Sequence, residues 1–259
     1  PAEDPWLDWT ILLGGYTKKG PSAGARLAWD RPFGFGMVEG WGIYDFEQED
    51  FDDYIPPEAF RWRVNFESRT YLDSLTRGLS FDAEFNQFSD RNVNLEYWEN
   101  DELTHKEYES YGRLRYPRDP FVATLIGKWH ERDFVTETTR LPEASLWITS
   151  LPLLTPARRG GPGIDLTSVS RIGLLEHRFA KGEPETDYAA SRLQTDTRAN
   201  LVFSLGDVRV ASYAGVSAAH YFDRSQGLDD VTRAALLAGV RTNLQIHRTW
   251  EARGGPFQL

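Results

Sequence analysis

Apolar and polar residues alternate strictly along much of the chain. From Phe60 to Ser68, the odd positions carry charged or amide side chains, and most of the even positions carry large apolar ones. The same period of two returns at 79–86, 196–205 and 236–247. Such segments are typical of β-strands with one apolar and one polar face. The pattern therefore predicts a large antiparallel sheet.

We expect about twelve strands, because that many alternating segments are separated by turn-forming or polar residues. They lie near Trp9–Tyr16, Ala23–Trp29, Met37–Phe46, Phe60–Thr70, Leu79–Phe88, Glu109–Tyr116, Phe121–Arg132, Arg140–Thr149, Ser168–Phe179, Ser191–Leu205, Val208–Asp223 and Asp230–His247. Gly, Pro and Asp at 19–22, 116–120 and 205–207 indicate tight hairpins. The polar connections 47–59 and 89–108 are longer, and we expect them to project beyond a membrane surface opposite the tight turns. The gap at 150–167 does not fit this arrangement.

Alternation alone does not separate a membrane β-barrel from a soluble β-sandwich, since both have one apolar and one wet face. Aromatic residues make up 14% of the chain, and many Trp and Tyr residues lie near predicted strand ends. The interfacial girdles of a barrel would place them there. Glycines on apolar faces, such as Gly14, Gly24 and Gly215, suit a curved barrel. These features favour an antiparallel transmembrane β-barrel, with residues 1–259 forming one barrel region.

Composition narrows the function classes. The net charge of −10 argues against nucleic acid as a partner, and the absence of cysteine excludes disulfides and thiolate metal sites. The longest apolar run, 234–240, is far shorter than the roughly 20 residues of a membrane-spanning helix. A barrel strand needs only about 9–11 residues with every second one apolar, which is compatible with a mean hydropathy of −0.51.

Two sequence blocks resemble a known family. The first is FSDRN at 88–92, followed by LEYWEN at 95–100 and ESY at 109–111; the second is DF at 133–134, followed by ETTRLPE at 137–143, which we interpret as the start of the next strand. In order and spacing they resemble the LptD family, the lipopolysaccharide-assembly (organic solvent tolerance) proteins of the outer membrane. The motif residues are Ser89, Asp90, Arg91, Arg140, Leu141, Pro142 and Glu143.

The resemblance implies a barrel of about two dozen strands in a Gram-negative outer membrane. Such a protein receives lipopolysaccharide from periplasmic bridge proteins and releases it through the lumen and a lateral opening into the outer leaflet. Outer-membrane lipids and a plug lipoprotein are further expected partners, and no enzymatic activity or cofactor is implied. No signal peptide or periplasmic jellyroll precedes Pro1, and the family's cysteines are missing. We therefore expect an incomplete barrel that lacks the remaining strands, and its open edges would be unstable alone in lipid.

Polar residues at alternate strand positions are the candidate functional residues. In a barrel they would face the lumen, where water and sugar hydroxyls satisfy them and arginines offer bidentate contacts to phosphates. Cross-strand ion pairing is the alternative role. The residues are Arg61, Arg63, Asn65, Glu67, Asp82, Glu84, Asn86, Arg198, Asn200, Arg241 and Asn243.

The sequence gives little support for an enzymatic active site or a metal site. The five histidines form no metal-binding pair, and no serine has a nucleophile-elbow context. An acidic run lacks the ordered spacing of a Ca²⁺ loop, and we interpret it as a solvated connection. It comprises Asp45, Glu47, Glu49, Asp50, Asp52 and Asp53.

Three other functions remain open. The first is an outer-membrane porin or channel. The second is a soluble, Trp-rich carbohydrate-binding sandwich, in which Trp41, Trp62, Trp98 or Trp147 would line a concave face. A glycosidase ranks last, because no carboxylate pair is singled out.

Overall fold

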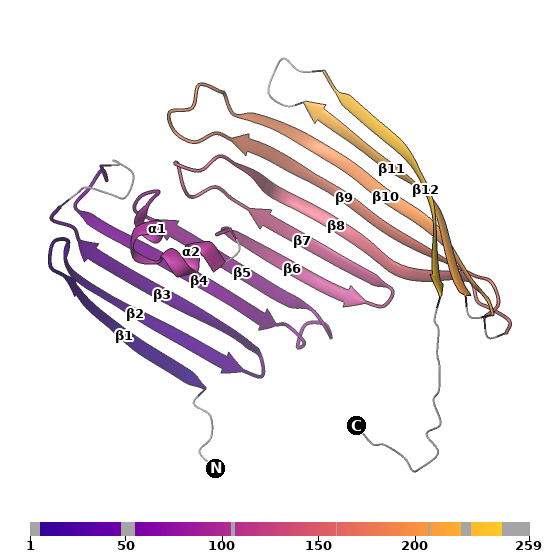
Figure 1. Cartoon of the computed structure of the whole chain (residues 1–259), viewed down its shortest axis with the longest axis horizontal. Helices are drawn as coiled ribbons and strands as arrows, with labels where there is room; N and C mark the ends of the chain where they lie inside the picture. Colours follow the sequence, from indigo (N-terminus) through magenta and orange to yellow (C-terminus); the bar gives the residue numbers. More distant parts are fainter. Residues whose placement is uncertain are drawn as a thin grey trace, which may run out of the picture.

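The computed structural model describes residues 6–47, 55–104, 107–158, 160–206, 208–223 and 229–244. Within these residues it contains twelve β-strands and two short α-helices (Figure 1). The strands are β1 (Leu7–Tyr16), β2 (Gly20–Arg31), β3 (Gly34–Tyr44), β4 (Phe60–Tyr71), β5 (Ser80–Phe88), β6 (Tyr111–Arg118), β7 (Phe121–Lys128), β8 (Glu137–Leu154), β9 (Gly163–Arg178), β10 (Tyr188–Leu205), β11 (Val208–Asp223) and β12 (Val231–Leu244). The helices are α1 (Val93–Tyr97) and α2 (Glu99–Thr104).

All strands belong to one antiparallel sheet in which each strand pairs with its neighbours in sequence. The order β1 to β12 is a simple meander, and β1 and β12 lie at opposite edges (Figure 1). The predictions of an all-β fold and of about twelve hairpin-connected strands are confirmed. The sheet is not closed into a barrel in the described residues, since no pairing joins β12 to β1.

The strand connections differ between the two ends of the sheet. At one end they span 32–33, 72–79, 119–120, 155–162 and 206–207; at the other they span 17–19, 45–59, 89–110, 129–136, 179–187 and 224–230. The tight turns 119–120 and 206–207 lie opposite the longest connections, as predicted, whereas the turn at 17–19 shares their end. The gap expected at 150–167 is shorter in the structure, because β8 continues to Leu154 and β9 begins at Gly163. The connection 155–162 therefore agrees with the alternation of short and long connections. Gly206 permits the last tight turn, since its φ is +61°.

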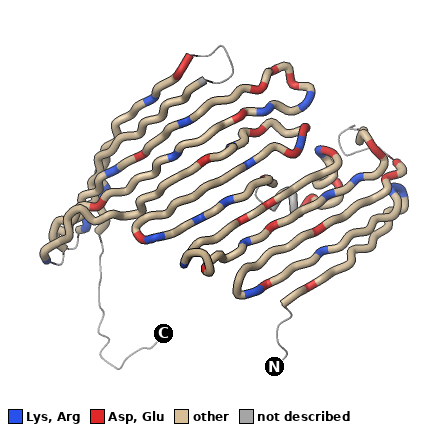
Figure 2. Tube along the Cα trace, turned by 180° about the vertical axis from the view of Figure 1, so that it is seen from behind, with Lys and Arg blue, Asp and Glu red and all other residues tan. Residues whose placement is uncertain are grey.

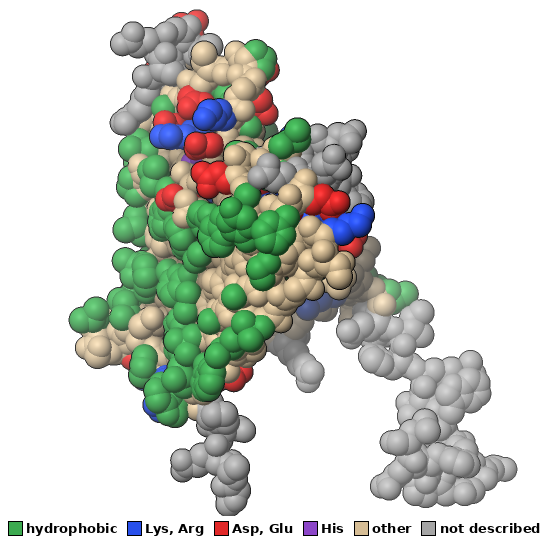
Figure 3. All heavy atoms as spheres, turned by 90° about the vertical axis from the view of Figure 1, so that its left-hand side faces the viewer, with side chains coloured by type: hydrophobic (Ala, Val, Ile, Leu, Met, Phe, Trp, Pro, Cys, Tyr) green, Lys and Arg blue, Asp and Glu red, His purple; other side chains and the backbone are tan. Residues whose placement is uncertain are grey.

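The two faces of the sheet have opposite chemistry. We call the face that carries Arg61, Arg63 and the helices the helix face; the apolar face, on the other side, carries Ile11, Leu13 and the positions in register with them. Apart from the last three residues at each strand end, the described residues of the apolar face include no Asp, Glu, Lys or Arg. Figure 3 looks onto the β1 side and shows hydrophobic side chains gathered along one side of the molecule.

Exposure runs opposite to that of a water-soluble sheet. On the apolar face Leu13 is 80% exposed and Leu236 is 89% exposed, whereas Arg61 on the helix face is fully buried. A water-soluble protein buries its large apolar side chains and rarely buries charges. The charged residues are spaced along the strands, as Figure 2 shows, and alternation places them on the helix face. Among the described residues, no second sheet covers the apolar face.

The connection 89–110 does not project from the sheet as expected. Its helix α1 lies over the helix face beside β4, and Figure 1 shows both helices in front of β3–β5. Val93 is completely buried there against Trp41, Ile43 and Phe88, which form a small apolar cluster on the otherwise polar face. The prediction that residues 89–108 project beyond the sheet is wrong for α1, because this helix supplies the apolar cover that Trp41, Ile43 and Phe88 require.

Candidate functional site

The eleven candidate polar residues all lie on the helix face. Arg61, Arg63, Asn65 and Glu67 alternate along β4, and the register places Asp82, Glu84 and Asn86 of β5 on the same side. Arg198 and Asn200 of β10 share this face through β6–β9, as do Arg241 and Asn243 of β12 through β11. The structure thus brings residues from strands far apart in sequence onto a single surface.

Arg61 is the centre of a buried ion cluster on this face. Its Nε and Nη2 atoms donate to the two carboxylate oxygens of Asp90, each at 2.9 Å, and its Nη1 lies 3.3 Å from Asp45 Oδ2 and also contacts Glu96. Lys19 approaches Glu96 at 2.6 Å and Asp45 at 3.6 Å. The carboxylates of Asp45, Asp90 and Glu96 thus share the cations of Arg61 and Lys19. Because buried charges need partners, this cluster fixes the connection 89–104 onto the sheet.

The first motif block supplies the carboxylate that holds Arg61. Asp90 is buried, its Oδ2 accepts the Ser89 hydroxyl at 2.8 Å, and its Oδ1 accepts the Asn92 backbone N–H at 3.0 Å. Ser89 Oγ accepts the backbone N–H of Trp62 at 3.0 Å, which ties the block to β4. Arg91 is exposed. Ser89 and Asp90 are therefore structural anchors of α1, which begins three residues after Asp90.

Two groups of this cluster that lie outside the strands have displaced pKa values. Burial lowers the pKa of Lys19, but its hydrogen bond to Glu96 and the negative charges of Glu96 and Asp45 outweigh this and raise the pKa overall. Burial raises the pKa of Tyr97, whose hydroxyl donates to Asp45 Oδ2 at 2.9 Å, and the neighbouring carboxylates raise it further. Both groups therefore stay protonated well into the alkaline range.

Arg63 forms a second anchor between α1 and the sheet. Its Nε donates to Glu39 Oε1 at 3.1 Å, and its guanidinium carbon lies 3.4 Å from the centre of the Trp98 ring. Trp98 packs edge-on against Trp41 at 5.8 Å. The ion pair with Glu39 and the stacking on Trp98 therefore compensate part of the cost of burying Arg63.

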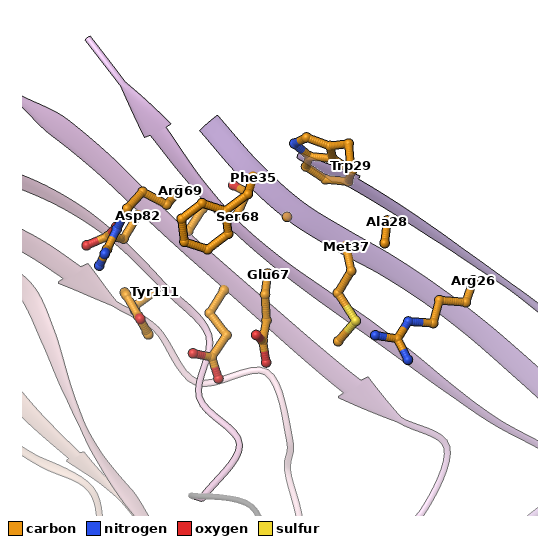
Figure 4. Close-up of a pocket in the computed structure, with 13 residues that line it drawn as sticks. Arg26, Ala28, Trp29, Phe35, Met37, Glu67, Ser68, Arg69, Asp82 and Tyr111 are labelled. Carbon is orange, nitrogen blue, oxygen red and sulfur yellow. The ribbon is translucent and has the colours of Figure 1, made fainter. Parts of the chain in front are cut away.

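The third ionic centre lies farther along β4–β6. Asp82 accepts Arg69 Nε at 2.5 Å and Arg113 Nη2 at 2.7 Å, so one buried carboxylate bridges three strands. Figure 4 shows Arg69 and Asp82 pointing toward one another at the side of a cavity of about 400 Å³ that Arg26, Met37 and Glu67 also line. Here cross-strand ion pairing, the alternative role of the polar residues, is what the structure shows.

The second motif block begins β8, as predicted, and it also contains an irregularity of that strand. Leu141 and Pro142 have no register partner in β7 or β9, and the pairing resumes at Glu143. Proline has no N–H to donate to the ladder, which explains the bulge at this point. Glu143 is buried, forms an ion pair with Arg192 and lies 3.7 Å from Arg140.

A second cavity, of about 420 Å³, opens on the helix face of β6–β9 beside this bulge. Arginines dominate its lining, since Arg113, Arg115, Arg140 and Arg171 face only one carboxylate, that of Glu143. The sequence prediction included Arg140 and Glu143 as motif residues but missed Arg115 and Arg171. The alternation of β6 and β9 could have indicated them, because Arg115 lies between Leu114 and Tyr116, and Arg171 lies beside Ile172.

The acidic run and the tryptophans are dispersed. Asp45 belongs to the Arg61 cluster, and Glu47 lies 3.8 Å from Lys18. Glu49, Asp50, Asp52 and Asp53 lie outside the described residues, as do His105 and His247. Among the residues that the structure describes, no group of His, Asp or Glu is arranged to hold a metal ion, and no helix is long and apolar enough to cross a membrane.

The four tryptophans of the carbohydrate-binding alternative do not form one surface. Trp41 is buried under α1, Trp98 covers Arg63, and Trp62 lies on the apolar face, whereas Trp147 lies on the helix face of β8. In comparisons with known proteins, no family model matches the chain and no curated protein matches it in sequence.

Proposed function

We propose that this chain forms part of a transmembrane β-barrel of the outer membrane. The observation that carries the proposal is the inversion of the two faces, with charges buried on the helix face and large apolar side chains exposed on the other. In a bilayer this arrangement is favourable, because hydrocarbon surrounds the apolar face and the polar face lines an aqueous interior. In water the exposed Leu and Val side chains would be costly.

The strand lengths and connections support the same proposal. The strands have 8 to 18 residues, and a tilted barrel strand needs about 9–11 to cross the hydrocarbon core. The two-residue connections 32–33, 119–120 and 206–207 lie at one end of the sheet, and the longest connections, 45–59 and 89–110, lie at the other, as in outer-membrane barrels. The open edges of β1 and β12 require closure in lipid, either with each other or with further strands.

Within this class we propose lipopolysaccharide transport. The support is the resemblance of two blocks to the LptD family, together with a helix face that carries paired arginines and amides over most of the sheet. The glycan of lipopolysaccharide would move along this wet face while the lipid leaves through a lateral opening into the outer leaflet. Periplasmic bridge proteins would deliver the lipid, and a plug lipoprotein would occupy the lumen. No catalytic step is part of the proposal.

Two alternatives predict different structures. A porin would share both faces and would need a complete barrel, but the two motif blocks favour the transport family. A soluble sandwich needs a second sheet packed on the apolar face, and the described residues form only one sheet.

Adjacent leucines in β12 provide a test of the membrane proposal. Leu236 lies on the apolar face and Leu237 on the helix face, opposite Gly215. In detergent micelles we expect Leu236→Arg to lose β-structure by circular dichroism at lower urea than the parent chain, and Leu237→Arg to unfold like it. Cooperative folding of the parent chain as a monomer without detergent would overturn the proposal.

Photocrosslinking tests the transport step. A photoreactive amino acid at position 200 on the helix face is expected to capture purified lipopolysaccharide, while the same group at position 77 in the connection 72–79 captures much less. Equal capture at both positions, or capture at neither, would contradict lipopolysaccharide transport and leave a general barrel.

A further inference from the structure

The cavity on β6–β9 differs from the one on β2–β5 in its charge balance. The first cavity has three carboxylates, Glu67, Asp82 and Glu84, against the two arginines Arg26 and Arg69. The second has four arginines against Glu143 alone. Only the second cavity has the excess of positive charge that attracts an anion.

Two of its arginines remain available for a ligand. Arg113 is engaged by Asp82, and Arg140 lies beside Glu143. Arg115 and Arg171 form no ion pair with any residue within the described part of the chain. Arg115 is exposed, and the guanidinium of Arg171 lies 5.3 Å from the centre of the Trp147 ring, which supports its position. These two side chains are thus free to pair with an external anion.

The register places these arginines at the ends of one cross-strand row. Arg115 of β6 pairs with Thr124 of β7, Thr124 with Ser145 of β8, and Ser145 with Arg171 of β9. Three strand spacings separate the arginines, or about 14 Å between their backbones. Both arginines line the same cavity. Between them lie the hydroxyls of Thr124 and Ser145, 2.5 Å apart, and Trp147 lies beside Ser145.

We propose that this cavity binds a phosphorylated saccharide, with the phosphate held by Arg115 and Arg171. Guanidinium groups bind phosphate through paired charge-assisted hydrogen bonds. The hydroxyls of Thr124 and Ser145 are suited to sugar hydroxyls, and the partly exposed Trp147 ring is suited to the apolar side of a pyranose. The identification of the saccharide as part of lipopolysaccharide rests on the proposed function, whereas the anion site rests on these residues alone.

Calorimetric titration of the full chain in micelles tests this site, with glucose 6-phosphate, inorganic phosphate and glucose as probes. We expect glucose 6-phosphate to bind more tightly than inorganic phosphate and glucose not to bind measurably. Each of Arg115→Gln and Arg171→Gln is expected to weaken binding about tenfold, the change that corresponds to about 1.4 kcal/mol. Trp147→Leu is expected to reduce the preference for the sugar phosphate over inorganic phosphate.

Arg77→Gln serves as the matched control, because Arg77 is exposed in the connection 72–79 and outside both cavities. Unchanged binding in the Arg115 and Arg171 variants, or equal loss in Arg77→Gln, would overturn the site. Binding of glucose as tight as that of its phosphate would overturn the assignment of the anion. Because detergent dependence is measured separately, a chain that needs detergent and binds no sugar phosphate would refute the site without refuting the barrel.

Discussion

Arg61 and Asp90 form a bidentate pair in which both hydrogen bonds measure 2.9 Å, although 29 positions separate the two residues in the chain. Arg61 belongs to β4 and Asp90 to the connection that leads into α1. The pair therefore joins the sheet to the segment that covers it. Since both side chains are almost fully buried, its loss leaves charges without compensation.

We expect Arg61→Met to release α1 from the sheet. The substitution removes the guanidinium that pairs with the carboxylates of Asp45, Asp90 and Glu96, and it leaves Asp90 without this ion pair. Breaking a buried pair in this way costs about 3–5 kcal/mol. Hydrogen exchange of residues 93–104 measures the release, and Arg77→Met is the control at an exposed arginine. Unchanged protection in Arg61→Met would contradict the role of this cluster.

Trp98→Leu tests the stacked pair with Arg63. A partly buried cation–π contact contributes about 0.5–2 kcal/mol, and its loss is expected to lower the free energy of unfolding by that amount. Trp6→Leu is a matched control, because Arg31 lies 3.8 Å above the exposed Trp6 ring. Urea unfolding in micelles is expected to show a smaller effect for Trp6→Leu, and the reverse order would refute the importance of burial here.

Gly173 faces Glu143 across β8 and β9, and its lack of a side chain makes room for that carboxylate. A Cβ at Gly173 would lie 2.8 Å from the Glu143 Cβ and 2.9 Å from its Cα. Gly173→Ala is therefore expected to destabilise the sheet by about 1–3 kcal/mol. Gly127→Ala in β7 has open space around it and is the control. Equal thermal midpoints for both variants would contradict the close approach.

Alkaline pH is expected to detach α1. The pKa values of Lys19 and Tyr97 are raised in the folded state, so the folded chain holds these protons more tightly than the unfolded chain. Stability is then independent of these groups below about pH 10 and falls as the pH rises above it. Hydrogen exchange of α1 at pH 9 and pH 11, corrected for the intrinsic rate, measures the loss. Tyr97→Phe is expected to reduce this dependence, and an unchanged slope would argue against Tyr97.

The strands could be predicted because a period of two is local. The segment Phe60–Ser68 shows both faces by itself. Alternation within each strand likewise assigns distant residues such as Asn243 to the polar set. The bulge in β8 also had a local signal, since Pro142 cannot donate to the ladder.

The helix cover and the ion cluster could not be predicted in the same way. With 5 residues, α1 is too short to show a helical period, and the pairing of Arg61 with Asp90 depends on how a long connection folds back. The sequence contains a weaker indication of the cover, because Trp41, Ile43 and Phe88 place apolar side chains on the helix face. Such a patch requires a cover, and Val93 provides it. The sequences of the edge strands β1 and β12 do not indicate whether these strands pair with each other.

Quenching of tryptophan fluorescence by a brominated detergent tests the central claim that the apolar face contacts hydrocarbon. Two variants retain a single tryptophan, one Trp62 on the apolar face and the other Trp147 on the helix face, with phenylalanine at the remaining positions. We expect strong quenching of Trp62 and weak quenching of Trp147 in micelles. Equal quenching, or stronger quenching of Trp147, would contradict a membrane-facing apolar surface.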